Sequence, residues 1–507
     1  MRRLLVLAVA ALVIAPSAGA APGFRYGVAA GEMTATSAVL WTRSNELGAV
    51  RLFVWPAPRK GMPFVQLTLK PAKGHDRVVQ RRVHGLKPNT RYTYLFSTPY
   101  RKNEIAAGGS FWTAPAPNAS ATVRFAISGD ADGARNPKTG KPAYNLFQVY
   151  GRMAAEQNHF NINLGDTIYS DSEVSGVPPA VTVPAKWAKY KENLGYAHLR
   201  NLRRGTGLYS HWDDHEFVND FSLPEHRKPI YRAGAVAFMD YAPVTYTGRT
   251  GLYRSFRWGR HLELFFLDER SFRSAKARTA CDNDLAPTAP QAVRDAFAAL
   301  VPSLAKPVPQ ACLDALASPS RTMLGARQYA AFTKAIKAST ATWKVVVNEV
   351  PIQQYFALPY DRWEGYPAER ERLLRFLQAN VKNVLFLTTD THANFVNEIR
   401  LSTFGPNGPV GTGIWEVVTG PVATNTQNKE VDETLGRPGM GSAITALFYK
   451  PKPPRGVGMA CASADVYSYA EVKVTGAAIT VTPKDLAGKL VHEETGGACG
   501  PFVFRAG

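Results

Sequence analysis

The chain has 507 residues, more than one compact core usually holds, so two or three domains are expected. Hydrophobic residues make up 45% and charged residues 20%, a balance that excludes global disorder. Lys and Arg outnumber Asp and Glu by 60 to 40, giving a net charge of +20 that favours anionic partners. No dense basic run is interleaved with aromatic residues, so a dedicated nucleic-acid partner is not expected.

Residues 1–20 have the composition of a secretory signal peptide. Arg2 and Arg3 precede an apolar run, and small residues at 18–20 supply the cleavage positions. The apolar run is shorter than the roughly 20 residues that span a bilayer, and no other stretch predicts a transmembrane segment. We therefore expect export to the periplasm or the extracellular space, by either the general secretory or the twin-arginine route.

The four cysteines agree with an oxidising compartment. No CxxC pair of the kind that binds zinc is present. Four cysteines in an exported chain predict two disulfides, with three possible pairings. The simplest pairing joins sequence neighbours, Cys281 with Cys312 and Cys461 with Cys499.

The residue pattern changes in character along the chain. Residues 24–113 contain short alternating strands and turn signals, as in an immunoglobulin- or fibronectin-like β-sandwich. A linker rich in Pro, Ala and Ser at 114–121 separates them from residues 122–507. There, nearly continuous apolar strands alternate with helical patterns such as 143–157 and 329–337, which indicates an α/β layered domain. An Ala- and Pro-rich stretch at about 274–322 is interpreted as an insertion.

Six of the expected strands run directly into acidic or amide residues. A single such residue is usually a cap or a turn, but six in a chain poor in carboxylates indicate one crevice at the strand ends. The strands are 123–128, 160–164, 207–212, 262–267, 343–347 and 383–388, and they lead into Asp130 and Asp132, Asp166, Asp213-Asp214-His215-Glu216, Asp268, Asn348-Glu349, and Asp390 with His392.

Clustered carboxylates repel one another unless cations neutralise them, so this pattern predicts a metal site. Two cations about 3.5–4 Å apart, bridged by one Asp, would bind the substrate oxygen and generate hydroxide near neutral pH. Such a centre suits the hydrolysis of an anionic phosphate ester.

The order of the motifs resembles a known family. Gly165-Asp-x-x-Tyr169, Asp213-Asp-His-Glu216 and Asp390-x-His392 resemble the calcineurin-like metallophosphoesterases and, more narrowly, the PhoD-type alkaline phosphatases. Leu267-Asp-x-Arg270 and Gly27-Val-Ala-Ala-Gly31 add to the similarity. The resemblance implies a metallophosphoesterase-type layered β-sandwich flanked by helices, preceded by a small all-β domain. It also implies an exported alkaline phosphatase that attacks phosphate esters with metal-activated hydroxide.

The resemblance assigns a role to each matching residue. Asp166 would bridge two metals, and Tyr169 would offer a phenolate to the first of them. His215 would face the phosphoryl oxygens or the leaving group rather than a metal. The implied metal ions are Fe(III) and Ca²⁺, with Mn²⁺, Mg²⁺ and Zn²⁺ as alternatives. The implied catalytic residues are Asp166 and His215, and the implied metal ligands are Asp130, Asp132, Asp166, Tyr169, Asp214, Asp390 and His392.

Two departures from the family pattern concern the metal ligands. The family commonly has a Ser-Cys pair after its first strand, whereas this chain has Ser128-Gly-Asp130 and lacks the thiolate. The wider superfamily also has a ligand histidine shortly after the position of Val346. This chain has no histidine there, which leaves Asn348 or Glu349 as candidates. PhoD-type enzymes resemble this chain in lacking that histidine.

Several alternatives stay open at this point. Arg270 either binds substrate phosphate through bidentate bonds or pairs with acidic residues inside the fold. The enzyme is alternatively a phosphodiesterase or phospholipase D-like protein that acts on phospholipids or on anionic polymers of the teichoic type. A further alternative is a non-catalytic exported binding protein.

Overall fold

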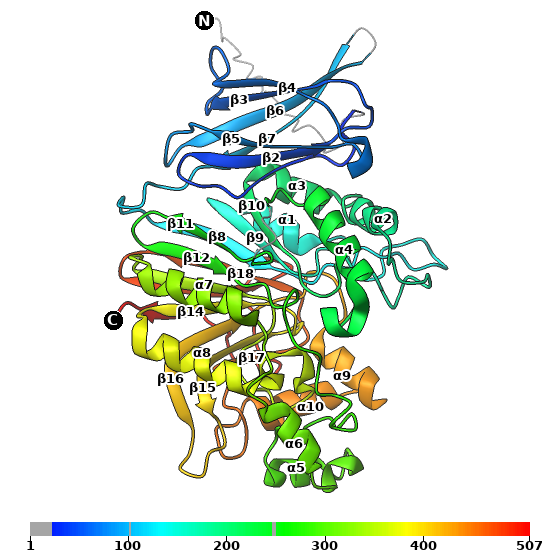
Figure 1. Ribbon diagram of the computed structural model, residues 1–507, viewed down its shortest axis with the longest axis vertical. Coiled ribbons are helices and arrows are strands. Elements are labelled where there is room, and N and C mark those ends of the chain that lie inside the picture. The colour runs from blue at the N-terminus through cyan, green and yellow to red at the C-terminus, as the bar shows by residue number, and fades with distance from the viewer. Residues whose placement is uncertain (1–22, 101–102, 246–249) are drawn as a thin grey trace, which may run out of the picture.

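The computed structural model describes residues 23–507 except 101–102 and 246–249. The expected signal peptide at 1–20 lies outside the described residues. Four β-sheets organise the chain, two small ones in the N-terminal part and two larger ones in the remainder (Figure 1). Within the described ranges, no helix combines the length and the apolar character that crossing a bilayer requires.

The N-terminal part is all-β, as expected. Its two antiparallel sheets have the orders β1-β2-β5 and β4-β3-β6-β7. Buried side chains from both sheets, among them Leu40, Val54 and Phe111, form the core between them. The strands are β1 (Val28–Gly31), β2 (Ser37–Arg43), β3 (Val50–Pro56), β4 (Val65–Leu69), β5 (Val78–His84), β6 (Arg91–Tyr100) and β7 (Asn103–Trp112), with a short 3-10 helix η1 (Lys73–His75) before β5.

The two larger sheets contain the strands predicted from the apolar runs. One has the order β10-β9-β8-β18-β19-β20, with β8 (Val123–Ser128), β9 (Phe160–Leu164) and β10 (Gly207–His211) parallel to one another. The other has the order β11-β12-β13-β14-β16-β15-β17, with β12 (Leu262–Phe266), β13 (Trp343–Asn348), β14 (Val384–Thr388) and β16 (Val410–Val418) parallel. The antiparallel strands are β11 (Arg254–Trp258), β15 (Asn394–Ser402), β17 (Cys461–Ser463), β18 (Ser468–Val474), β19 (Ala478–Asp485) and β20 (Phe502–Arg505).

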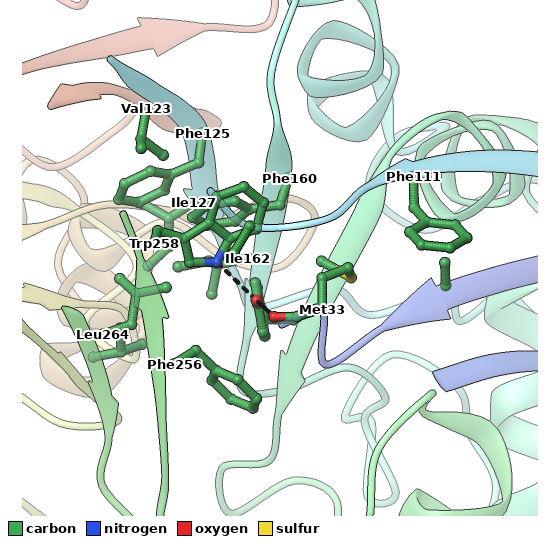
Figure 2. Packing of buried hydrophobic residues seen from close by; sticks show 14 of the residues in the cluster. Met33, Phe111, Val123, Phe125, Ile127, Phe160, Ile162, Phe256, Trp258 and Leu264 are labelled. Carbon is green, nitrogen blue, oxygen red and sulfur yellow. Dashed lines mark hydrogen bonds between the residues drawn. The ribbon is translucent and has the colours of Figure 1, made fainter. Parts of the chain in front are cut away.

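The two larger sheets face each other, and helices cover their outer faces. Phe125, Phe160 and Trp258 pack between the sheets, with ring centroids 4.8 Å apart for Phe125–Phe160 and 4.5 Å for Phe160–Trp258 (Figure 2). Every residue of β9, β13 and β14 is buried, because both of their faces are covered. The covering helices are α1 (Gln148–Ala155), α2 (Val183–Asn193), α3 (Ala197–Gly205) and α4 (Leu223–Tyr241) on one side, and α7 (Gly325–Ala338) and α8 (Pro367–Asn380) on the other.

Both expected helices form, with different lengths. The first was expected over 143–157, but α1 begins only at Gln148, because Phe147 adopts a left-handed conformation (φ 61°). The Asn145 side chain accepts a hydrogen bond from the Phe147 N–H and fixes this turn. The second helix, expected over 329–337, extends to Gly325–Ala338 as α7.

The stretch interpreted as an insertion forms a small lobe at the lower end of the molecule (Figure 1). The Cys281–Cys312 disulfide closes it, and Cys461–Cys499 attaches β17 to the C-terminal segment. The simplest of the three pairings is therefore confirmed. The remaining short elements are α5 (Gln291–Phe297), η2 (Pro302–Ala305), α6 (Gln310–Ala317), η3 (Pro359–Asp361), η4 (Trp363–Gly365), α9 (Gln427–Leu435), α10 (Met440–Ile444) and the π-helical turn η5 (Thr445–Tyr449).

The N-terminal sheets are joined to the larger part by buried polar contacts. Trp41 donates its indole N–H to the Asp240 carbonyl oxygen at 2.7 Å. Arg254 pairs with Glu32 at 2.9 Å. The Tyr209 hydroxyl donates to the Met33 carbonyl oxygen at 2.5 Å. These contacts place the N-terminal part against β10, β11 and α4.

Candidate metal centre

Three strand ends bring carboxylates to one edge of the facing sheets. Asp130 follows β8, Asp166 follows β9 and Asp390 follows β14. All three have a positive φ, at 63°, 47° and 68°, a conformation that non-glycine residues seldom adopt. Such conformations persist only where the surrounding structure enforces them, and they concentrate at functional sites.

The glycines before two of these aspartates allow the loops to approach each other. A Cβ at Gly129 would collide with the Leu164 carbonyl oxygen. Gly165 has φ 69°, and a Cβ there would lie 2.7 Å from the Asp213 Cβ. The Gly-Asp pairs therefore combine close backbone packing with a carboxylate at the sheet edge.

The side chains at this edge form overlapping groups of metal-ligating atoms. Within each group, the ligand atoms all lie within 4.8 Å of one another. Asp166 belongs to two successive groups, and Asp214 links the second to the third, so the groups make one continuous row. We call this the donor row; its three groups are Asp130–Asp166–His392, Asp166–Asp214–His215 and Asp213–Asp214–Asp390.

The charge of the donor row is incompletely balanced by the protein. Asp130 and Asp213 each have one buried carboxylate oxygen without a hydrogen-bond partner among the described residues. Burial raises the pKa of Asp130 to about 7 and that of Asp213 to about 8. Burial also raises the pKa of Asp166 well above its ordinary value, and the charges of neighbouring carboxylates add to this. Bound cations would relieve both penalties, so the residues present fit metal ions.

Tyr169 reaches the first group from the loop after Asp166. Its hydroxyl oxygen lies 3.1 Å from Nε2 of His392, so both atoms can approach one ion. Burial raises the pKa of Tyr169 well above its ordinary value, and the charges of Asp166 and Asp130 add to the effect. A phenolate at this position therefore needs a cation to stabilise it.

His215 is oriented from both sides of its ring. Its Nδ1 lies 2.6 Å from the Asp171 carboxylate, and its ring stacks on Tyr169 with centroids 4.1 Å apart. Burial opposes protonation of His215, but the charges of Asp166 and Asp214 raise its pKa well above the ordinary value. His215 is thus a fixed donor beside the carboxylates.

His392 is oriented by a helix from the C-terminal part. Its Nδ1 lies 2.6 Å from Oε1 of Glu430 on α9. Metal-binding histidines commonly donate their second ring N–H to a carboxylate in this way. Burial opposes protonation, but the charges of Glu430 and Asp130 raise the pKa of His392 to about 9. The contact leaves Nε2 directed toward the first group.

Arg270 is fully buried among carboxylates. Its guanidinium donates to Asp213, and Nη1 donates to Asp361 at 2.6 Å. Nη2 lies 3.6 Å from Asp214 and 3.4 Å from Asp390. Of the two expected roles of Arg270, these pairs favour the one inside the fold over a direct phosphate contact.

The donor row opens into a cavity of about 680 Å³. Asp166, Tyr169, Asp214, His215 and His392 all line it. A phosphate ester that enters this cavity can therefore reach every group of the row.

Known protein families match the sequence over both parts of the chain. The family described as PhoD-like phosphatase matches residues 138–454, more than half of the chain. The chain belongs to the PhoD-like phosphatases. The N-terminal domain of PhoD-like phosphatases matches residues 10–115. The protein is accordingly a phosphoric ester hydrolase of a metallophosphatase family.

Individual relatives agree with this membership. Alkaline phosphatase D of Bacillus subtilis (strain 168) is 25% identical over 447 residues, which cover 77% of this chain and 70% of that protein. A solved structure of PhoD superposes with a TM-score of 0.73 at 21% identity, over 96% of this chain and 90% of its own. The structure of a purple acid phosphatase from yellow lupin (Lupinus luteus) seeds superposes with a TM-score of 0.56 at 12% identity, over 92% of this chain and 73% of its own. The two structures share the expected layered α/β fold.

This PhoD-like phosphatase brings most of the expected ligands together. Asp130, Asp166, Asp214, Asp390 and His392 all belong to the donor row, and Tyr169 adjoins it. Asp132 does not belong to it. The Asp132 carboxylate accepts hydrogen bonds from the Ala134 N–H at 2.8 Å and the Ser172 hydroxyl at 2.5 Å, so it links its own loop to the loop after β9.

Two of the six acidic strand ends do not contribute to the donor row. Asp268, after β12, accepts hydrogen bonds from the Leu252 N–H at 2.7 Å and the Ser271 hydroxyl at 2.6 Å. Glu349, after β13, accepts from the Glu269 N–H at 2.7 Å. Asp268 and Glu349 thus bond to neighbouring loops, whereas Asn348, the other candidate after β13, has a buried side-chain oxygen without a hydrogen-bond partner among the described residues.

Two supporting residues and one member of the row received no role from the sequence. Asp171 lies two residues after Tyr169, and its position near the motif is a usable signal for a histidine partner. Asp213 was noted only as part of its motif. Glu430 is 38 residues from His392 in a polar helix, and no sequence feature connects the two.

Proposed function

We propose that this protein is an exported alkaline phosphatase that hydrolyses phosphate esters at a two-metal centre. The observation that carries the proposal is that the Asp166 carboxylate belongs to two adjacent groups of the donor row. A carboxylate shared in this way is suited to bridging two cations. Asp130, Tyr169 and His392 would complete the first site, and Asp214 and Asp390 the second.

The cations, when bound, would supply a hydroxide nucleophile near neutral pH and offset the charge of the phosphate. The chain's own residues orient the ester. His215, held by Asp171 and stacked on Tyr169, would donate an N–H to a phosphoryl or leaving-group oxygen. Asp130, Asp166 and Asp214 are buried, and this low-dielectric setting strengthens the electrostatic contacts of the row.

For the metals we propose Fe(III) in the first site and Ca²⁺ in the second. A phenolate is a hard oxygen donor that stabilises Fe(III), and the Tyr169 hydroxyl lies 3.1 Å from the His392 nitrogen that would share the ion. The second site has carboxylate oxygens, and Asn348 on β13 stands where the superfamily has a histidine. Hard oxygen donors favour Ca²⁺ or Mg²⁺ over Zn²⁺.

Metal analysis and visible absorption test the metal assignment. Protein purified without added metal should contain iron and calcium, and a phenolate bound to Fe(III) should give it a visible charge-transfer colour. Tyr169→Phe should remove the colour, whereas Tyr150→Phe, at a buried tyrosine bonded to Asn163, should keep it. Colourless and fully active wild-type protein without iron would overturn the assignment.

Ester comparison tests the activity itself. One preparation is assayed with 4-nitrophenyl phosphate and with bis(4-nitrophenyl) phosphate at alkaline pH. A higher kcat/KM for the monoester supports an alkaline phosphatase, and the reverse ratio would replace it with a phosphodiesterase. Metal-loaded protein that cleaves neither ester would support a binding protein instead.

Mass analysis tests the proposed export. The first residue of the exported protein should be Ala21, the residue after the expected signal peptide.

A further inference from the structure

The cavity at the donor row has two chemically different ends. Carboxylates and histidines line one end, as described above. The other end is apolar; its side chains belong to one hydrophobic cluster and come from the insertion, from the segment before η3 and from the C-terminal helices. We call this end the apolar chamber; its main residues are Val293, Phe297, Val301, Phe356, Ile444 and Phe448.

The side chains of the chamber are only partly covered by the protein. Val293, Phe297, Val301 and Ile444 are half-buried, although they adjoin a cluster of fully buried residues. They line the cavity with their remaining surface. Apolar surface that is open to water inside a cavity is stabilised when an apolar group covers it.

The walls of the chamber are held in place without a ligand. Phe297 and Phe448 meet edge to face with ring centroids 5.6 Å apart. Arg294 on α5 is buried and forms a two-pronged ion pair with Asp284, with both distances at 2.8 Å. The Cys281–Cys312 disulfide closes the same segment. A preformed wall loses little conformational entropy when a ligand binds.

We propose that the apolar chamber binds the alkyl part of an amphiphilic phosphate ester while the donor row binds its phosphate. This inference rests on the proposed function, because the two ends belong to one cavity. The alkyl group would displace water from the partly exposed side chains. A polar polymer of the teichoic type would leave the chamber uncovered, so the structure favours esters of apolar alcohols.

A series of monoalkyl phosphates tests the inference. Ethyl, butyl, hexyl and octyl phosphate are hydrolysed below their micelle concentrations, and released phosphate is measured. A fully buried methylene contributes enough free energy for about a fourfold gain in affinity. We therefore expect kcat/KM to rise about two- to fourfold per added methylene until the chamber is full.

Val293→Asn tests whether the chamber is responsible. The substitution places a polar amide in the wall, so the ratio of kcat/KM for octyl over ethyl phosphate should fall at least tenfold. The matched control is Leu313→Asn, at a leucine of the same insertion that is 40% exposed and outside the chamber, and its ratio should stay unchanged. Circular dichroism and thiol titration establish that both variants are folded and disulfide-bonded.

A binding assay separates this inference from the proposed function. An amphiphilic fluorescent dye with an apolar ring system, 1-anilinonaphthalene-8-sulfonate, should be displaced from the metal-free protein by octan-1-ol but not by ethanol, and Val293→Asn should weaken displacement. Ethyl phosphate hydrolysis without any chain-length dependence would overturn the chamber and leave the proposed function standing. Displacement of the dye without hydrolysis of any ester would overturn the proposed function and leave an apolar binding site.

Discussion

Two sets of partly or fully buried carboxylates in this molecule differ in whether the protein neutralises them. Asp76, at the junction of the N-terminal sheets with the larger part, pairs with Arg43 at 2.9 Å and accepts a hydrogen bond from the Tyr241 hydroxyl at 2.5 Å. Burial opposes its ionisation, but these partners lower its pKa to about 2. In the donor row, the pKa values of Asp130 and Asp166 are raised instead.

The difference separates residues that hold the fold from residues that await a ligand. Where the chain supplies the counter-charge, as at Asp76, a carboxylate stabilises the folded state. Where it does not, the buried charge is a cost that a bound cation removes. Arg270 lies at the boundary, since it pairs with Asp213 and Asp361, at the end of the row away from Asp130. Removing a charge at Asp76 should therefore lower the stability of the folded protein, whereas removing one from the donor row should leave the stability of the metal-free protein equal or raise it.

The largest effect is expected for Asp166→Asn. The amide keeps the shape of the side chain but loses the charge that would bridge two cations, so kcat/KM with 4-nitrophenyl phosphate should fall by about three orders of magnitude or more. Because the change also removes repulsion within the row, the thermal midpoint of the metal-free protein should stay equal or rise. Turnover close to that of the wild type would show that Asp166 is only a turn residue.

His215→Ala should give the next largest loss. General acid–base groups contribute about 10²- to 10⁴-fold, so kcat should fall within that range. Because His215 is proposed to contact the phosphoryl group, the metal content per chain should not change. His84→Ala, at an exposed histidine of β5, is the control and should leave both quantities unchanged. Loss of one metal ion per chain from the His215 variant would instead make it a ligand.

Glu430→Gln should weaken metal binding at the first site without removing a ligand. Carboxylates that orient a metal-bound histidine typically contribute 10- to 100-fold to affinity or activity. Iron should therefore be lost faster to a chelator from this variant. Glu433→Gln is the matched control, because Glu433 lies exposed on the same helix and bonds to Asn425 at 3.1 Å. Equal rates of iron loss from the two variants would exclude the orienting role of Glu430.

The parts of the fold that the sequence predicted are those with a local signal. Strands such as β9 and β14 are buried on both faces, so each is a continuous apolar run that is readable without knowing its neighbours. The pairing of β18 with β8 had no such signal, because the two strands lie more than three hundred residues apart in the chain. The sheet order therefore depends on contacts that no local pattern encodes.

The same distinction applies to the candidate site. Gly165-Asp166 and Asp390-x-His392 are short motifs at strand ends, and the structure brings them together. Whether Arg270 faces substrate or carboxylates depended on the location of Asp361, 91 residues away. The contact of Glu430 with His392 could not be predicted from the sequence either, because only the packing of α9 places the two side chains together. Sequence motifs thus indicated the ligands, and the tertiary fold determines what orients them.

The smallest effect is expected at Asp76, the carboxylate whose charge the protein itself balances. Asp76→Asn removes a charge that the N-terminal junction balances, so the free energy of unfolding at pH 7 should fall by about 1–2 kcal/mol. Activity should stay unchanged, because Asp76 is remote from the donor row. Urea unfolding and the 4-nitrophenyl phosphate assay measure the two quantities. Asp314→Asn, at an exposed aspartate of α6, is the control and should change neither.

The pH dependence of this loss distinguishes an ionic junction from mere packing. The folded pKa of Asp76, about 2, lies below its ordinary value of 3.8, so the ionised carboxylate stabilises the fold above pH 3.8. That contribution disappears as the pH falls toward 2, where the carboxylic acid forms in both states. The stability difference between wild type and Asp76→Asn should accordingly be full at pH 5 and shrink at pH 2.5. A difference that stays constant over this range would mean that Asp76 acts through its shape, and the contrast with the donor row would no longer rest on charge.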